Sequence, residues 1–165
     1  MQKAPIPSNE NKRLCAVRDL RILDTGLEER FDLITKEATS RFNVPISTIT
    51  IIDSEREWFK SKNGTDAKEG PRDISFCGHA LVSEVMMVIE DTLKDPRFAD
   101  NPMVTHTPFI RFYAGKSLYE RKTGLPVGVF CIKDYKPRKM DLDEINDFLE
   151  LATKAEDELN KIVEC

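Results

Sequence analysis

The sequence lacks long hydrophobic runs and paired cysteines. No window approaches the roughly 18 consecutive apolar residues of a membrane span, and the N-terminal segment MQKAPIPSNENKR has no apolar stretch of the kind found in signal peptides. The chain has only four cysteines, none of them in a CxxC pair, so neither a disulfide framework nor a zinc ribbon is indicated. We therefore expect a cytoplasmic protein with reduced thiols that does not span a membrane.

Positive charge is not in excess either. The 25 Lys and Arg residues are outnumbered by 29 Asp and Glu residues, which gives a net charge of −4. No global positive field is available to attract a phosphate backbone, so a nucleic-acid partner is not expected. The common enzyme signatures are also missing, since the sequence has no GxxxxGKS or GxxxxGKT loop, no GxGxxG after a strand, no HExxH and no GxSxG.

The composition supports one folded domain. Of the 165 residues, 40% are hydrophobic, and a chain of this size buries roughly 70% of the surface that it exposes when unfolded. Two prolines and a polar SNENK run near the start predict a flexible N-terminal arm over residues 1–11. Residues 12–165 are expected to form a single domain that includes the C-terminal helix.

Hydrophobic periodicity predicts helices at both ends of the chain and strands between them. Thr25 and Glu28 match a TxxE capping box, and the apolar stripe that follows predicts a helix over 25–42. The other predicted elements are a short helix at 12–20, strands near 46–52, 56–62, 86–90, 110–119 and 127–133, a short helix over SFCGHALVSE, and a last helix from about 141. This order indicates an α+β domain built on one antiparallel sheet.

Seven sequence blocks carry a resemblance to a known family. They are ILDTGLEERFD (22–32), VPISTITIID (44–53), WFKSKNG (58–64), RDISFCGHAL (72–81), DPRFADNP (95–102), IRFYAG (110–115) and GVFCIKDYKPR (128–138). With these blocks the chain resembles the GAF domain family, and within it the subgroup found in bacterial sensor proteins beside histidine kinases and diguanylate cyclases. The resemblance implies a GAF-like (PAS-like) antiparallel sheet of about six strands with helices on both faces. It also implies a small-molecule pocket on one face, and first and last helices on the other that often dimerise.

One departure from the family pattern concerns the last strand. The block GVFCIKD has Phe130 where the subgroup usually has Leu, and the charged Lys133 where it usually has an apolar residue. A cation at this position suggests a partly exposed strand end. Members of the family bind cyclic nucleotides, bilins, haem, amino acids or nothing known, so the ligand and any cofactor of this chain stay unidentified.

The resemblance implies a non-catalytic sensory or regulatory domain. Its pocket would lie between the sheet and the SFC and DPRFADNP segments, and ligand occupancy would change the terminal helices. The alternative is a dimeric interaction scaffold whose pocket is vestigial and filled by side chains. A minor alternative is the GAF-fold enzyme free methionine sulfoxide reductase, which needs a nucleophilic cysteine in a region between Cys77 and Cys131 where this sequence has none.

Eight residues are candidates for contact with a ligand. They are Arg72, Phe76, Cys77, His79, Phe112, Tyr113, Cys131 and Asp134. Arg72 would hold an anionic group in bidentate fashion or, alternatively, pair with a structural carboxylate, for which the candidates are Asp91, Asp95 and Asp134. Alternation along a strand lets only one of Phe112 and Tyr113 face the pocket, and it leaves open which face of the 127–134 strand does so.

The cysteines and histidines do not indicate a metal site. On a helix, Cys77 and His79 would point about 200° apart, so they would not bind one metal ion together. Because no base or second cysteine is adjacent, Cys77 and Cys131 are expected to be buried and slow toward thiol reagents, and Cys165 to react first.

The last helix predicts self-association. Its apolar stripe continues to the end of the sequence without a Gly or Pro stop signal. We therefore expect a homodimer through the terminal helices, with Leu149, Leu159 and Ile162 as contacts. The alternative is that the stripe packs wholly on the sheet.

Overall fold

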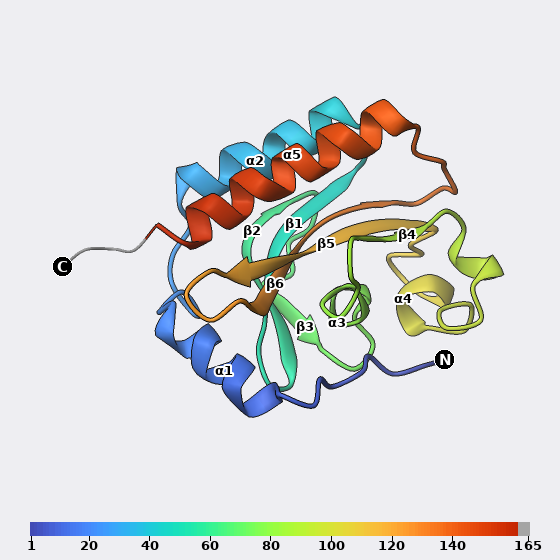
Figure 1. The fold of residues 1–165 in the computed structure, drawn as a ribbon. Helices are drawn as coiled ribbons and strands as arrows, with labels where there is room; N and C mark the ends of the chain where they lie inside the picture. Colours follow the sequence, from blue (N-terminus) through green and yellow to red (C-terminus); the bar gives the residue numbers. More distant parts are fainter. Residues whose placement is uncertain (162–165) are drawn as a thin grey trace.

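The computed structural model describes residues 1–161 and has an α+β architecture (Figure 1). Its helices are α1 (Glu10–Asp19), α2 (Glu29–Arg41), α3 (Phe76–Ala80), α4 (Pro102–Thr105) and α5 (Leu142–Leu159), with a short 3-10 helix at Thr92–Lys94. Its strands are β1 (Ile46–Ile52), β2 (Arg56–Asn63), β3 (Glu69–Pro71), β4 (Met87–Ile89), β5 (Phe112–Glu120) and β6 (Leu125–Asp134). They form one antiparallel sheet in the order β3-β2-β1-β6-β5-β4. Helices α2 and α5 lie side by side over one face, and α3 and α4 lie on the other. The predicted α+β class with one antiparallel sheet is confirmed.

The five predicted strands are all present. Strand β1 has its predicted bounds, because the β-branched run ISTITII favours extended backbone throughout. The bounds of the other four strands differ from the prediction by at most two residues. Strand β3 was not predicted, because its three residues, EGP, are too few to show an alternating pattern. It pairs with β2 at the edge of the sheet.

The sheet separates two hydrophobic cores. Strand β1 is buried at every position, as expected for a strand that is covered on both faces. Alternation along β6 places Phe130 and Ile132 in the core beneath α2 and α5, whereas Val129 and Cys131 lie in the core beneath α3. The question that the sequence left open is therefore answered: the Cys131 face of β6 is the one opposite the long helices.

Helix α2 begins four residues later than predicted, at Glu29. The TxxE pattern does not form a capping box, because Glu28 is the N-cap residue and makes no side-chain cap. Instead, the fully buried Lys60 on β2 donates to the Thr25 hydroxyl (2.8 Å) and the Gly26 carbonyl (2.6 Å) and forms an ion pair with Glu28. A buried ammonium needs such partners, so a tertiary contact replaces the local cap.

Helix α5 starts with the capping box that α2 lacks. Asp141 accepts a hydrogen bond from the backbone N–H of Glu144 (2.8 Å), and the Glu144 side chain accepts one in return. Leu159 lies in the core between α5 and the sheet and is 5% exposed, so its predicted role as a dimer contact is wrong. Leu149 is half-buried, and Ile162 lies outside the described residues.

The segment before α1 lies against the α3 side of the molecule. The backbone N–H of Gln2 donates to the carbonyl of Arg97 (3.0 Å), and that of Ala4 donates to the carbonyl of Asp73 (2.9 Å). The side chain of Ala4 is buried. The start of the chain therefore contacts the two segments that flank α3, as Figure 1 shows for the blue end of the ribbon.

Candidate functional site

Aromatic side chains fill the space beneath α3, where the sequence predicts a pocket. Phe76 stacks on Phe98, with ring centroids 4.8 Å apart, and on Tyr113 at 5.2 Å. All three side chains are fully buried. Gly115 makes room for this arrangement, because the Tyr113 hydroxyl occupies the position that a Cβ atom at residue 115 would need. A ligand cannot lie between Phe76 and the sheet unless these rings move.

A cavity of about 260 Å³ lies on the same face of the sheet, beside this aromatic stack. Strands β1 and β2 contribute Ile46 and Phe59 to its floor. The segment between β3 and α3 supplies Ile74, and Met103 of α4 and Ile110, which precedes β5, add further apolar side chains to the lining. This mostly apolar lining is typical of small-molecule sites. The volume is slightly below the range of roughly 300–1,000 Å³ that accommodates drug-sized ligands, which indicates a smaller ligand.

Two buried residues of opposite charge also line the cavity. Glu57 on β2 is 2% exposed and Lys133 on β6 is 4% exposed. Within the described part of the chain, Glu57 Oε1 has no hydrogen-bond partner and no direct ion pair joins the two side chains. Their strands are separated by β1, yet both side chains reach the start of α3. Glu57 lies beside the Ser75 hydroxyl, and Lys133 Nζ is 6.0 Å from the centroid of the Phe76 ring.

Burial and mutual attraction both affect the ionisation of this pair. Burial raises the pKa of the Glu57 carboxyl, because a carboxylate is poorly solvated in the interior, and the positive charge of Lys133 only partly offsets this effect. Burial also disfavours the ammonium of Lys133, but the negative charge of Glu57, with a smaller effect of the nearby thiols, outweighs burial and raises the pKa of Lys133 to about 12. Lys133 is therefore charged at neutral pH.

A group of buried hydroxyls and thiols lies next to the cavity. The Thr48 hydroxyl, which lines the cavity, is 3.0 Å from the sulfur of Cys131, and the Tyr113 hydroxyl donates to the sulfur of Cys77 (3.1 Å). Burial raises the pKa of both Cys77 and Tyr113, so these groups are protonated at neutral pH. For Cys131, burial is outweighed by the neighbouring Cys77 thiol, the charge of Lys133 and the Thr48 hydroxyl, which together lower the pKa to about 7.

Accessibility is expected to control the reactivity of these thiols. Cys77 and Cys131 are fully buried, whereas Cys15 on α1 is exposed; Cys165 lies outside the described residues. In a variant in which Cys15 and Cys165 are both serine, we expect Ellman's reagent to react slowly with the folded protein and rapidly after denaturation. Rapid labelling of Cys77 in the folded variant would contradict this expectation and would indicate a redox or covalent function.

Arg72 has a structural partner. Its guanidinium forms an ion pair with Glu10 of α1 and donates to the carbonyl of Asp53 (3.0 Å). The same Glu10 carboxylate also pairs with the fully buried Arg13 (2.8 Å). Arg72 does not line the cavity. The geometry therefore agrees with the structural interpretation of Arg72, although the partner is none of the three carboxylates that the sequence suggested.

The other predicted site residues lie in different places. Phe76, Cys77, Tyr113 and Cys131 come together beneath α3. Phe112 instead lies in the core beneath α2 and α5, and Asp134, its partner across the β5–β6 ladder, is on that side too, 3.5 Å from the guanidinium of Arg138. The placement of Phe112 and Asp134 on the pocket face is thus corrected, because Tyr113 and Lys133 take that face.

His79 takes part in packing rather than in the cavity. Its Nε2 atom is 3.1 Å from the carbonyl oxygen of Gln2, and its ring packs edge-on against Phe98. Cys77 faces Tyr113 instead, so the two residues point to different partners, as the helical spacing predicts.

The sequence analysis missed Glu57 and Phe59 as lining residues and misjudged Lys133. The expectation that Lys133 marks a partly exposed strand end is wrong, since its side chain runs inward beneath α3. A signal was available: Glu57 and Phe59 alternate with Trp58 and Lys60 along β2, so they share a face. Glu57 is a charged residue that shares a strand face with the aromatic Phe59, and its strand pairs with β1, which is buried at every position. This pattern indicates a charged side chain directed into a buried site.

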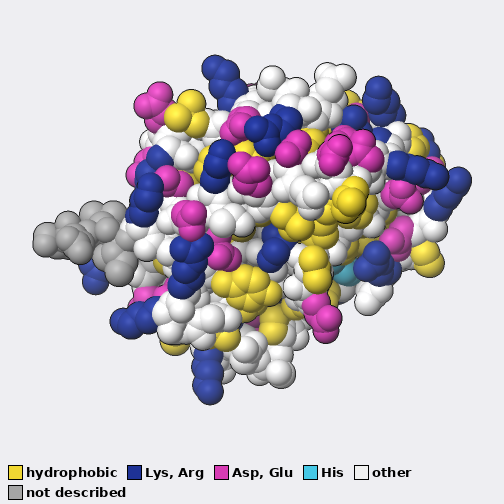
Figure 2. Space-filling view, turned by 45° about the horizontal axis from the view of Figure 1, so that its top comes forward, with side chains coloured by type: hydrophobic (Ala, Val, Ile, Leu, Met, Phe, Trp, Pro, Cys, Tyr) yellow, Lys and Arg dark blue, Asp and Glu magenta, His cyan; other side chains and the backbone are white. Residues whose placement is uncertain are grey.

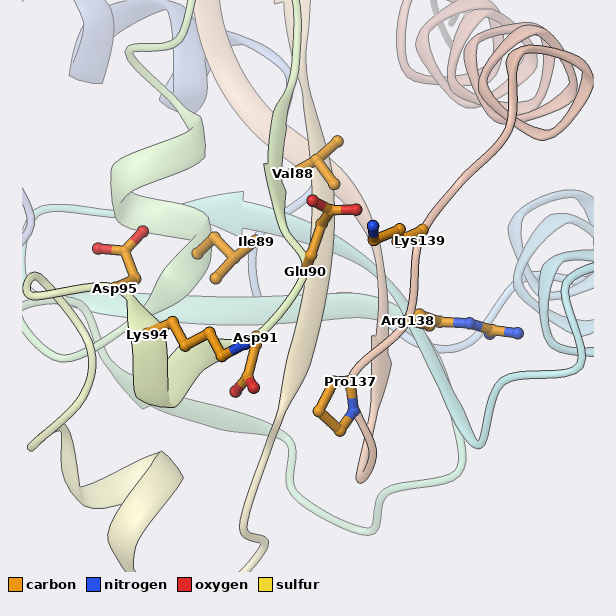
Figure 3. A pocket seen from close by; sticks show the side chains of 9 residues that line it. All are labelled: Val88, Ile89, Glu90, Asp91, Lys94, Asp95, Pro137, Arg138 and Lys139. Atoms are coloured by element: carbon orange, nitrogen blue, oxygen red, sulfur yellow. The ribbon is translucent and has the colours of Figure 1, made fainter.

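A second and larger hollow lies on the surface, between β4 and the segment after β6 (Figure 3). It measures about 590 Å³ and is lined by charged side chains of both signs. In Figure 3, Glu90 and Lys139 point toward each other across it, whereas the Arg138 side chain turns away. Asp91 is already paired with Arg111 (3.1 Å). Glu90 and Lys139 are exposed, and this hollow is more open than the cavity with Glu57 and Lys133, so we regard that cavity as the better site.

Residues 1–161 contain neither a candidate membrane-spanning helix nor a candidate metal site. No helix there has both the length and the apolar composition to cross a membrane. No group of three His, Cys, Asp or Glu side chains is placed so that it could hold a metal ion.

Part of a longer curated protein is similar in sequence to this chain. Over 138 residues the chain is 41% identical to a cyclic di-GMP phosphodiesterase of Pseudomonas aeruginosa; the match covers 84% of this chain but only 23% of that protein. The chain thus spans about a quarter of the length of this curated relative.

Solved structures with low sequence identity share the fold. The GAF domain of an Acinetobacter phosphoenolpyruvate-protein phosphotransferase is similar with a TM-score of 0.62 at 14% identity, over 90% of this chain and 93% of that one. A type II free methionine-R-sulfoxide reductase of Thermoplasma acidophilum is similar with a TM-score of 0.64 at 10% identity, over 88% and 96%. The family model for the GAF domain matches residues 26–159. The chain therefore belongs to the GAF domain family.

Proposed function

We propose that this chain is a cytoplasmic, non-catalytic sensory or regulatory domain that binds a small molecule in the 260 Å³ cavity. The observation that carries the proposal is the buried pair Glu57 and Lys133, which line the cavity without a direct ion pair between them. Burying a charge without a partner is costly. A bound molecule that completes the hydrogen bonding of both groups accounts for their presence.

The cavity wall offers a route for the signal. Pro71 and Ile74 line the cavity, and Arg72, between them in sequence, forms the ion pair with Glu10 of α1. A ligand that shifts the 71–74 segment therefore changes a contact with the N-terminal helix. Such a ligand acts only if it binds the two arrangements of this segment with different affinity.

The Pseudomonas relative suggests what the domain regulates. That protein is named a cyclic di-GMP phosphodiesterase, and the matched stretch is only 23% of it. We infer that domains of this type control a signalling enzyme, for which a cyclic di-GMP phosphodiesterase, a diguanylate cyclase or a histidine kinase is the candidate class. The cavity is too small for cyclic di-GMP itself, a dinucleotide with two guanine bases, so the regulating ligand is expected to be a different and smaller molecule.

Two alternatives predict other results. A scaffold with a vestigial pocket is supported by the stack of Phe76, Phe98 and Tyr113 beneath α3, and it predicts no bound molecule. The reductase alternative needs an accessible nucleophilic cysteine, but Cys77 and Cys131 are fully buried. It predicts turnover of free methionine sulfoxide.

Native mass spectrometry of protein purified from cells tests the proposal. We expect an adduct with the mass of a small molecule, which is released on denaturation and which raises the Tm of the stripped protein when it is added back. Failure to find any adduct, together with no rise in Tm upon addition of a cell metabolite extract, would favour the scaffold. Turnover of methionine sulfoxide would favour the reductase.

We also propose that the domain forms a homodimer through the outer face of α2 and α5. Leu33 and Leu142 are exposed on these helices, and Leu149 is half-buried. In Figure 2, which turns this layer toward the reader, hydrophobic side chains are interspersed with charged side chains of both signs. We expect a dimeric mass by light scattering and a monomeric mass after Leu33→Glu combined with Leu149→Glu. A monomeric mass of the unaltered protein would contradict the dimer.

A further inference from the structure

We infer that the cavity is specific for a small zwitterion, in which an ammonium group binds Glu57, an anionic group such as a carboxylate binds Lys133, and an apolar side chain contacts the remaining walls. This inference rests on the proposed function, because it identifies the ligand class of the same cavity. It combines three features of the cavity: its two buried charges, its mostly apolar lining and its volume.

The two charges are placed as anchors. Glu57 Oε1 is buried and has no hydrogen-bond partner among the described residues, so it can accept a hydrogen bond from a donor in the cavity. Lys133 is a buried donor whose ammonium forms no direct ion pair in that part of the chain, so it can donate to an anion. Hydrogen bonds to charged groups are among the stronger ones in proteins. A ligand that carries both complementary charges is therefore favoured over one that carries only one of them.

The two anchors lie near each other but are not in direct contact. Their side chains start on β2 and β6, with β1 between them, and both end near the first residues of α3. Because both side chains line the cavity and no direct ion pair joins them in the described part of the chain, a ligand group in the cavity can contact the carboxylate and the ammonium. In an α-amino acid the ammonium and the carboxylate are on one carbon atom, so a single small molecule of this type can contact both anchors.

The remaining lining determines the other half of the ligand. Ile46, Phe59, Ile74, Met103 and Ile110 present apolar side chains to the cavity. A volume of about 260 Å³ equals about nine water molecules at roughly 30 Å³ each. This space accommodates a zwitterion with one apolar side chain, and it is too small for a dinucleotide.

The test varies both the ligand and the protein. The probes are L-leucine, L-methionine and L-phenylalanine, each compared with its N-acetyl derivative, which lacks the ammonium, and its amide, which lacks the carboxylate. Binding is measured by calorimetry and by the shift in Tm. For the unaltered protein we expect at least one free amino acid to bind, and each derivative to bind about 10- to 100-fold more weakly, which is the loss of one hydrogen bond to a charged group.

The protein variants assign each loss to one anchor. Glu57→Gln should weaken binding of the free amino acid about 10- to 100-fold and leave the affinity of the N-acetyl derivative nearly unchanged, because the group that binds Glu57 is already missing. Lys133→Met should likewise weaken binding of the free amino acid and leave the affinity of the amide nearly unchanged, because the amide already lacks the carboxylate that binds Lys133. Glu90→Gln and Lys139→Met in the open hollow of Figure 3 are matched controls and should leave binding unchanged.

The outcomes separate this inference from the proposed function. If the molecule retained from cells is not a zwitterion, or if its affinity is insensitive to both Glu57→Gln and Lys133→Met, the inference is wrong while the sensory function stands. If neither the probes nor a cell extract yields a binder, both are wrong. If the variants fail to fold, the affinities of the derivatives for the unaltered protein still test the inference. Equal affinity of a free amino acid and its derivatives would show that the cavity is not specific for a zwitterion.

Discussion

Replacing Glu10 by glutamine is expected to lower the free energy of unfolding by about 3 kcal/mol at pH 7. Glu10 is the shared partner of Arg13 and Arg72, of which Arg13 is fully buried and Arg72 nearly so. Burial opposes ionisation of Glu10, but the two guanidinium groups outweigh it and lower the pKa to about 2. The variant leaves two guanidinium groups without their counter-ion, which is the costly way to break such a contact. Urea denaturation of both proteins measures the difference.

The same contact predicts a dependence on pH. Because the pKa of Glu10 is lower in the folded state than in the unfolded chain, its contribution is fully present above the unfolded value, near 4.5, and is lost as the pH falls from about 5 through 2. The unaltered protein and Glu10→Gln should therefore differ most at neutral pH and converge near pH 2. Glu84→Gln is the matched control: Glu84 is exposed, and its replacement should change stability by less than about 0.5 kcal/mol. A constant difference between pH 7 and pH 3 would argue against the proposed role of Glu10.

Replacing Phe76 by alanine is expected to cost about 3–5 kcal/mol of unfolding free energy. The ring is fully buried, stacks on both Phe98 and Tyr113 and lies 6.0 Å from the ammonium of Lys133. Its removal takes away the buried surface and both aromatic contacts, and it leaves a void that the neighbouring rings cannot close without leaving their positions. Thermal and urea denaturation would measure the loss.

Phe76→Leu is the control for volume, and it should cost less because it retains most of the buried surface while removing only the stacking. A loss below about 1 kcal/mol for Phe76→Ala would show that the space beneath α3 is loosely packed. In that case a ligand could bind in the pocket that the sequence predicts between α3 and the sheet. The stack of Phe76, Phe98 and Tyr113 would then no longer separate this pocket from the cavity lined by Ile46 and Phe59.

The sequence by itself determined the fold class and most of the strands. The β-branched run of β1 and the alternation along β6 are local patterns, and each of the five predicted strands lies within about two residues of its predicted bounds. The period of two also placed Val129, Cys131 and Lys133 together on one face of β6. It could not say which face, because both faces of a central strand are buried and both have apolar side chains.

Contacts between distant residues were decided only by the tertiary structure. Arg72 and Glu10 are 62 residues apart, so no local spacing could identify the partner of Arg72. Thr25 and Glu28 have the spacing of a capping box, but Lys60, 35 residues from Thr25, binds both because its buried ammonium needs acceptors.

The candidate site depends on the same kind of long-range arrangement. Glu57 and Lys133 come from two strands that become neighbours of β1 only when the sheet forms, and both side chains extend toward the start of α3. The strand period in the sequence specifies only which side chains of each strand share a face. How close the two charges lie, and whether a cavity remains between them, follows from how the whole chain packs.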